Sequence, residues 1–100
     1  MQTRKELIWS PLAETDLDGV LKYLFEKWGK LAVEDFIELT EKTLLQLSTN
    51  PKLFPVIESK KKIRKCVLTK HNSIFYRENK FSIDVLRIFD TRQDPNKFKK

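Results

Sequence analysis

The residues with the clearest chemical potential are basic side chains in the second half of the chain. Residues 59–100 carry thirteen Lys or Arg and four Asp or Glu, a net charge of +9, whereas residues 1–58 carry a net charge of −3. Guanidinium groups match phosphate oxygens bidentately, and a cationic surface also attracts acidic protein segments. The predicted basic binding surface consists of Lys61, Lys62, Arg64, Lys65, Arg77, Arg87 and Arg92.

The four arginines of this surface could act together on one phosphate if they share a concave face of a sheet. In a nuclease such cations stabilise the charge that develops on phosphorus, while a separate acid or base moves protons. The alternative for each arginine is a solvated sheet face, on which it pairs with a carboxylate such as Asp84 or Asp90.

Candidates for proton transfer or nucleophilic attack are few. His71, the only histidine, falls in a predicted turn, where a side chain is poorly held. Cys66 lies within a predicted strand and is expected to be a small buried hydrophobic residue. Tyr76 alternates within another strand, and its phenol, with an ordinary pKa of about 10, needs strong perturbation to act as a base. Phosphate loops, serine elbows and metal-ligand spacings are missing, so we expect no metal and no cofactor.

Composition predicts a small cytoplasmic protein. One hundred residues form a single domain over 1–100, and 40% hydrophobic residues with only two glycines exclude a disordered chain. A single cysteine excludes an internal disulfide and fits a reducing compartment. No apolar run approaches the ~20 residues that cross a bilayer, and the amino end lacks a leader pattern, so we expect no membrane contact.

Two amphipathic helices are predicted after a short edge strand over residues 5–9. Ser10-Pro11 ends that strand and begins the first helix, because the serine oxygen can accept an orphan N–H at a position that proline tolerates. Gly29 separates this helix from the second, which ends before Asn50-Pro51. The apolar stripes consist of Ala13, Leu17, Val20, Leu21, Leu24 and Trp28, and of Val33, Phe36, Ile37, Leu44 and Leu47.

Three sequential antiparallel strands are predicted after a loop centred on Pro55, over residues 63–68, 73–77 and 81–89. The order β-α-α-β-β-β predicts an α+β fold, in which the helical hairpin packs on one face of a small antiparallel sheet and leaves the other face partly open. In residues 81–89 strict alternation gives two faces, one with Phe81, Ile83, Val85, Arg87 and Phe89 and the other with Ser82, Asp84, Leu86 and Ile88. Both sets are half apolar, so the last strand is expected inside the sheet.

An ordered series of short motifs runs over nearly the whole chain: IWSPLAETDL at 8–17, YL at 23–24, WG at 28–29, NP at 50–51, FP at 54–55, IRK at 63–65, SIFYR at 73–77 and IFDTRQDP at 88–95. This series resembles the RelE/ParE superfamily of type II toxins, closest to its ParE-like, plasmid-stabilisation branch. The resemblance implies the β-α-α-β-β-β fold and a cytoplasmic toxin that arrests growth and is held inactive by a cognate antitoxin.

The resemblance also implies two possible mechanisms. RelE-like toxins cut mRNA in the ribosome with basic sheet residues and a terminal Tyr or His, whereas ParE-like toxins block DNA gyrase. Arg64 and Arg92 match the basic positions of the nucleases and would be the catalytic residues if this chain cuts RNA. The other positions of that set depart from the nuclease pattern, and they are Cys66, Ser73, Asp90 and Phe98. Because the residues of a catalytic set act together, the loss of several of them argues against RNA cleavage. Gyrase inhibition is therefore the first hypothesis, and a ribosome-dependent endoribonuclease is the alternative. The third hypothesis is an inactive relative that binds only its antitoxin.

Overall fold

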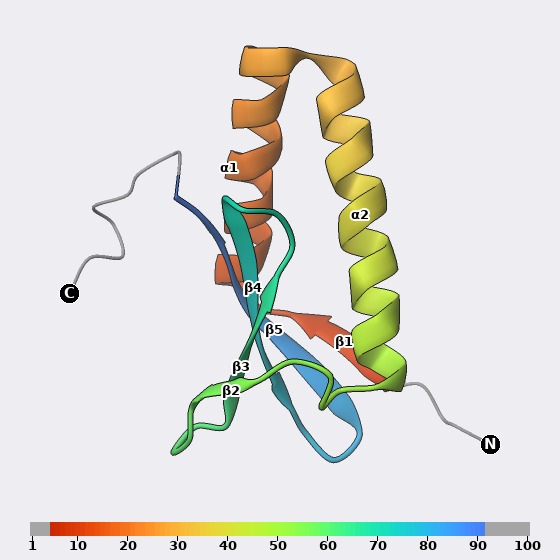
Figure 1. The fold of residues 1–100 in the computed structure, drawn as a ribbon, viewed down its shortest axis with the longest axis vertical. Coiled ribbons are helices and arrows are strands. Elements are labelled where there is room, and N and C mark those ends of the chain that lie inside the picture. Colours follow the sequence, from red (N-terminus) through yellow and green to blue (C-terminus); the bar gives the residue numbers. More distant parts are fainter. Residues whose placement is uncertain (1–4, 92–100) are drawn as a thin grey trace.

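The computed structural model describes residues 5–91 as two helices and five strands (Figure 1). In chain order these are β1 (Glu6–Trp9), α1 (Pro11–Trp28), α2 (Lys30–Thr49), β2 (Val56–Glu58), β3 (Ile63–Val67), β4 (Asn72–Glu78) and β5 (Ser82–Asp90). The predicted order of elements is confirmed, with one addition. The short strand β2 lies in the segment after Pro55 for which the sequence predicts a loop.

The strands form one sheet in the order β1-β5-β4-β3-β2. Neighbours from β5 to β2 are antiparallel, whereas β1 runs parallel to β5. The sheet is therefore mixed rather than wholly antiparallel, because the two helices between β1 and the later strands supply the long crossover that a parallel pair requires. The predicted edge position of the first strand and the interior position of the last are both confirmed.

The helix boundaries follow the local signals in the sequence. The Ser10 hydroxyl accepts a hydrogen bond of 3.0 Å from the Ala13 N–H, and Pro11 occupies the first turn. Gly29 joins the helices with a φ of 89°, in the region that favours glycine. Within residues 5–91 neither helix has the length together with the apolar character that crossing a bilayer requires.

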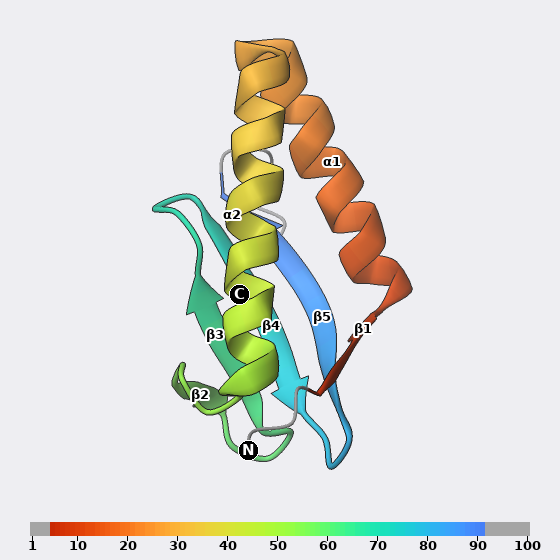
Figure 2. The same cartoon turned by 90° about the vertical axis from the view of Figure 1, so that its right-hand side faces the viewer.

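Both helices pack on the sheet, with α2 in front of its middle strands and α1 alongside β5 (Figure 2). Leu47 of α2 and Ile74, Ile83 and Val85 of the sheet are fully buried between these layers. Each such side chain contributes about 1.5–3 kcal/mol by leaving water. The end of the hairpin that joins α1 to α2 projects beyond the sheet, so Trp28 is 59% exposed although its spacing placed it on the buried stripe.

A β-bulge interrupts β5. Its pairing partners on β4 change from Tyr76 with Val85 to Phe75 with Arg87, which makes Leu86 an extra residue. An extra residue reverses the alternation of side chains that follows it. Arg87 therefore lies on the face opposite Val85, and the strict alternation predicted over residues 81–89 is wrong beyond Val85.

Candidate functional site

The register between β3 and β4 separates the predicted arginines. Arg64 pairs with Tyr76, which is the chain neighbour of Arg77. Paired residues share a face of an antiparallel sheet and successive residues alternate, so Arg64 lies on the helix-covered face and Arg77 on the opposite face. Arg87 shares the face of Arg77. A shared face was the condition for these arginines to act on one phosphate, and Arg64 does not meet it with Arg77 and Arg87. Arg92 lies outside the described residues.

Arg64 is anchored to the loop that precedes β2. Its Nη1 donates to the Phe54 carbonyl at 2.5 Å and lies 3.5 Å from the Lys52 carbonyl. The Tyr76 hydroxyl donates to the Pro51 carbonyl of the same loop at 2.9 Å. These two side chains hold the loop against the sheet, so part of the hydrogen-bonding capacity of the Arg64 guanidinium is used structurally.

A groove of about 550 Å³ lies beside Arg64. We call it the basic groove, and its lining residues are Lys52, Val56, Ser59, Lys62, Arg64 and Glu78. Three cations face one carboxylate, and Glu78 is already engaged by Lys5 at 2.8 Å and by Lys52 at 2.9 Å. Hydrogen bonds from these two lysines lower the pKa of Glu78 and keep it ionised. The basic groove thus keeps an excess of positive charge and suits an anionic partner.

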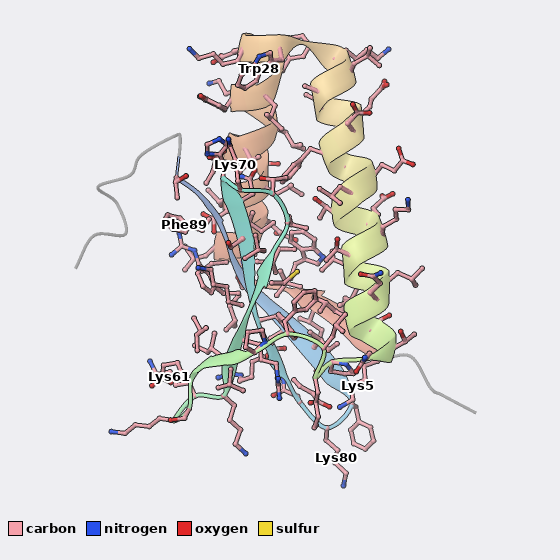
Figure 3. The ribbon with its side chains drawn as sticks, in the orientation of Figure 1. Lys5, Trp28, Lys61, Lys70, Lys80 and Phe89 are labelled. Atoms are coloured by element: carbon pink, nitrogen blue, oxygen red, sulfur yellow. The ribbon has the colours of Figure 1, made fainter. Side chains whose placement is uncertain are left out.

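Lys62 stands at the rim of the basic groove in an unusual conformation. Its φ is 58°, in the left-handed region that residues other than glycine seldom adopt. Both Lys61 and Lys62 are exposed in the turn before β3. Figure 3 shows Lys61 at the end of the molecule that also holds Lys5 and Lys80. The turn therefore presents two ammonium groups to solvent next to Arg64.

The open face of the sheet carries the other basic residues, and two of them are paired with carboxylates. Arg77 Nη2 lies 3.4 Å from Asp84 Oδ2, one of the alternatives considered from the sequence. Lys65 shares this face, because it pairs with Phe75. The predicted basic surface is therefore divided between the basic groove and the open face.

Asp16 of α1 is the partner of Arg87, and spacing alone did not indicate it. Its carboxylate accepts from Arg87 Nε at 2.7 Å and Nη2 at 3.1 Å, and from the Ile88 N–H at 3.0 Å. The Asp16 side chain is only 7% exposed, and its hydrogen bonds raise the pKa of Arg87. Ser10 also donates to the Leu86 carbonyl at 2.7 Å. Side chains at the start of α1 thus provide hydrogen-bond partners for the backbone of β5 beyond the end of β1. Arg87 has a structural role here, because its ion pair with Asp16 joins β5 to α1.

The described candidates for proton transfer are buried or lie apart from the basic groove. Tyr76 and Cys66 are fully buried; burial raises the pKa of the Tyr76 phenol and raises that of the Cys66 thiol to about 11. Both are protonated at neutral pH, and the predicted burial of Cys66 is confirmed. His71 lies in the connection between β3 and β4, as expected. Residues 5–91 contain no group of three His, Cys, Asp or Glu side chains that could hold a metal ion.

The fold is that of a small α+β protein, in which a helical hairpin packs on a mixed five-stranded sheet and a basic groove lies at one end. The chain belongs to the family of ParE toxins of type II toxin–antitoxin systems (parDE), whose family model matches residues 7–95. No curated protein sequence matches the chain closely enough to count as a relative.

Solved structures of toxins share this fold. A chromosomal ParDE toxin–antitoxin system from P. aeruginosa aligns with a TM-score of 0.73 at 18% identity, over 87% of this chain and 96% of that one. A copper-bound mutant toxin from Helicobacter pylori gives 0.60 at 17% identity, over 90% and 98%. The E. coli DinJ-YafQ toxin–antitoxin complex gives 0.55 at 14% identity, over 90% and 96%. At these identities the likeness establishes the fold alone.

Proposed function

We propose that this toxin arrests growth by binding DNA gyrase, and that a cognate antitoxin holds it inactive and so stabilises the replicon that encodes both. The observation that carries the proposal is the separation of Arg64 from Arg77 and Arg87 on opposite faces of the sheet. A binding mechanism needs no convergence of these groups, whereas RNA cleavage needs cations and a proton-transfer group around one phosphate.

The pairing of the basic residues supports the same choice. Arg64 is engaged by loop carbonyls, and Arg77 and Arg87 are engaged by carboxylates. Tyr76 and Cys66 carry their protons at neutral pH and are closed off from solvent. Among the described residues the one carboxylate that lines the basic groove is Glu78, and it is engaged by Lys5 and Lys52. The basic groove therefore offers charge for binding, and its carboxylate is occupied by two ion pairs.

The basic groove suits an acidic antitoxin segment. It is bordered by β2, which lies at the edge of the sheet and exposes 43% of Val56 and 52% of Ile57. An extended segment can add to such an edge through its backbone and place apolar side chains on these two residues. The lysines of the basic groove would then attract acidic side chains of the same segment.

Purified toxin, separated from its antitoxin, tests the target directly. In a supercoiling assay with gyrase and relaxed plasmid, we expect inhibition at a toxin concentration comparable to that of the enzyme, and relief by added antitoxin. Transcripts from cells that express the toxin should show no new codon-specific 5′ ends. Absence of gyrase inhibition together with such ends would establish the endoribonuclease instead.

The antitoxin contact is tested by Lys62→Glu, with Lys70→Glu as the matched control. Lys70 is an exposed lysine of the same basic half, and Figure 3 shows it away from Lys61. We expect Lys62→Glu to weaken antitoxin binding about tenfold or more, with gyrase inhibition retained and the control unchanged. Equal affinities for the two variants would rule out the basic groove as the antitoxin site.

A further inference from the structure

The last turn of α1 and the first turn of α2 carry exposed apolar side chains. Phe25, Trp28 and Leu31 are 60%, 59% and 72% exposed. We call these three side chains the hairpin tip. Figure 3 places Trp28 at the opposite end of the molecule from Lys61 and Lys80, where the helices extend past the sheet. Exposed apolar groups gathered at one end of a small protein are typical of interaction sites.

The charge around the hairpin tip selects the kind of partner. Residues 22–35 carry three lysines and three acidic residues, a net charge of zero, whereas residues 59–100 carry +9. Two of these charges, on Lys30 and Glu34, lie 3.9 Å apart as an ion pair along α2. An electrically balanced surface does not concentrate nucleic acid or anionic lipid. Its aromatic and aliphatic groups fit an apolar pocket on another protein.

The size of the hairpin tip argues against a second copy of the chain. Three large side chains exposed to this extent offer on the order of 400 Å² of surface. Two tips packed together would bury about 800 Å² in total, which is the size of crystal-packing contacts and below the ~1,200 Å² of a stable complex. A projecting tryptophan with two apolar neighbours is instead typical of the anchor of a larger interface.

From this we propose that the hairpin tip is the anchor that inserts into an apolar pocket of the toxin's protein target. The inference rests on the proposed function, in which that target is gyrase. It assigns target recognition to the end of the molecule opposite the basic groove. It also accounts for a tryptophan that stays 59% exposed at a helix end, where its ring contacts Tyr23 edge to face but lies beyond the sheet.

The test compares Trp28→Ala and Leu31→Asp with Phe81→Ala. Phe81 is a matched control, because it is 78% exposed in the turn between β4 and β5, next to Lys80 at the other end of the molecule. We expect both tip variants to raise the concentration that half-inhibits supercoiling at least tenfold, and Phe81→Ala to change it less than twofold. The unfolding midpoint and the antitoxin affinity should stay near those of the wild type in all three.

The outcomes distinguish the two proposals. Wild-type protein that fails to inhibit gyrase overturns the proposed function. Wild-type protein that inhibits gyrase, with tip variants that inhibit it equally well, overturns the inference on the hairpin tip alone. Tip variants that lose antitoxin binding but still inhibit gyrase would assign the hairpin tip to the antitoxin. A wild-type dimer in sedimentation that Trp28→Ala converts to a monomer would assign the tip to a second copy of the chain. Either result would also overturn the inference on the hairpin tip.

Discussion

Arg64 and Arg77 lie one register position apart on neighbouring strands, yet their side chains leave opposite faces of the sheet. Arg64 fixes the loop before β2 and lines the basic groove, whereas Arg77 pairs with Asp84 on the open face. One phosphate cannot contact both guanidinium groups across the sheet. The arrangement therefore favours binding at separate surfaces over a single catalytic centre built from these two residues.

Asp16→Ala should destabilise the fold. The substitution leaves Arg87 and the Ile88 N–H without their common acceptor in a nearly buried place. We expect the free energy of unfolding to fall by about 2–4 kcal/mol. Denaturant titration measures this change, with Asp18→Ala on an exposed position of the same helix as the control. A loss no larger than that of the control would contradict a structural role for the pair.

Tyr76→Phe should separate stability from toxicity. It removes the hydrogen bond of 2.9 Å to the Pro51 carbonyl and leaves the buried ring in place. We expect a loss of about 1 kcal/mol in the free energy of unfolding and no loss of growth arrest. Growth curves after induction, with protein levels compared by immunoblot, check the second part. Abolished toxicity at an unchanged protein level would show that the phenol takes part in the activity.

The stability of the toxin should depend on pH through Glu78. Lys5 and Lys52 hold the pKa of this carboxyl below its ordinary value of 4.5, so the ionised form stabilises the folded state above that value. This contribution, about 1 kcal/mol or less for a partly exposed pair, is lost as the pH falls through the lowered pKa. Between about pH 5 and pH 3 the wild type should lose more stability than Glu78→Gln. Parallel curves for the two proteins would contradict the prediction.

Cys66 should be unreactive in the folded toxin. Its thiol is fully buried, and burial raises its pKa to about 11, so at pH 8 almost no thiolate is available. Ellman's reagent should react at least ~100-fold more slowly with native protein than with protein in guanidinium, where one thiol is titrated. Rapid reaction of the native protein would show that β3 opens readily.

Much of the fold could be predicted because its signals are local. Ser10-Pro11, Gly29 and Asn50-Pro51 mark the helix ends through capping and proline chemistry that a few neighbouring residues determine. The exposure of Trp28 could not be read from its spacing, because periodicity defines a stripe but does not show how far the sheet extends beneath it.

The candidate site was less predictable, because it depends on register and on distant pairs. The extra residue Leu86 reverses the face of Arg87, and no glycine or other local signal marks the bulge. Asp16 meets Arg87 across 71 residues of chain, and Lys5 meets Glu78 across 73. These residues come together only in the folded chain. Their ion pairs determine which basic side chains are used within the protein and which are left to bind another molecule.

Titration of gyrase supercoiling with the wild-type toxin and with Arg64→Gln tests the central claim most directly. Glutamine keeps a neutral N–H donor at this position and removes the positive charge that a phosphate would require. Binding of gyrase without chemistry at Arg64 predicts that both proteins inhibit supercoiling at concentrations within about threefold of each other. A wild-type toxin that leaves gyrase active and cleaves mRNA, with cleavage lost about 100-fold or more in Arg64→Gln, would contradict it.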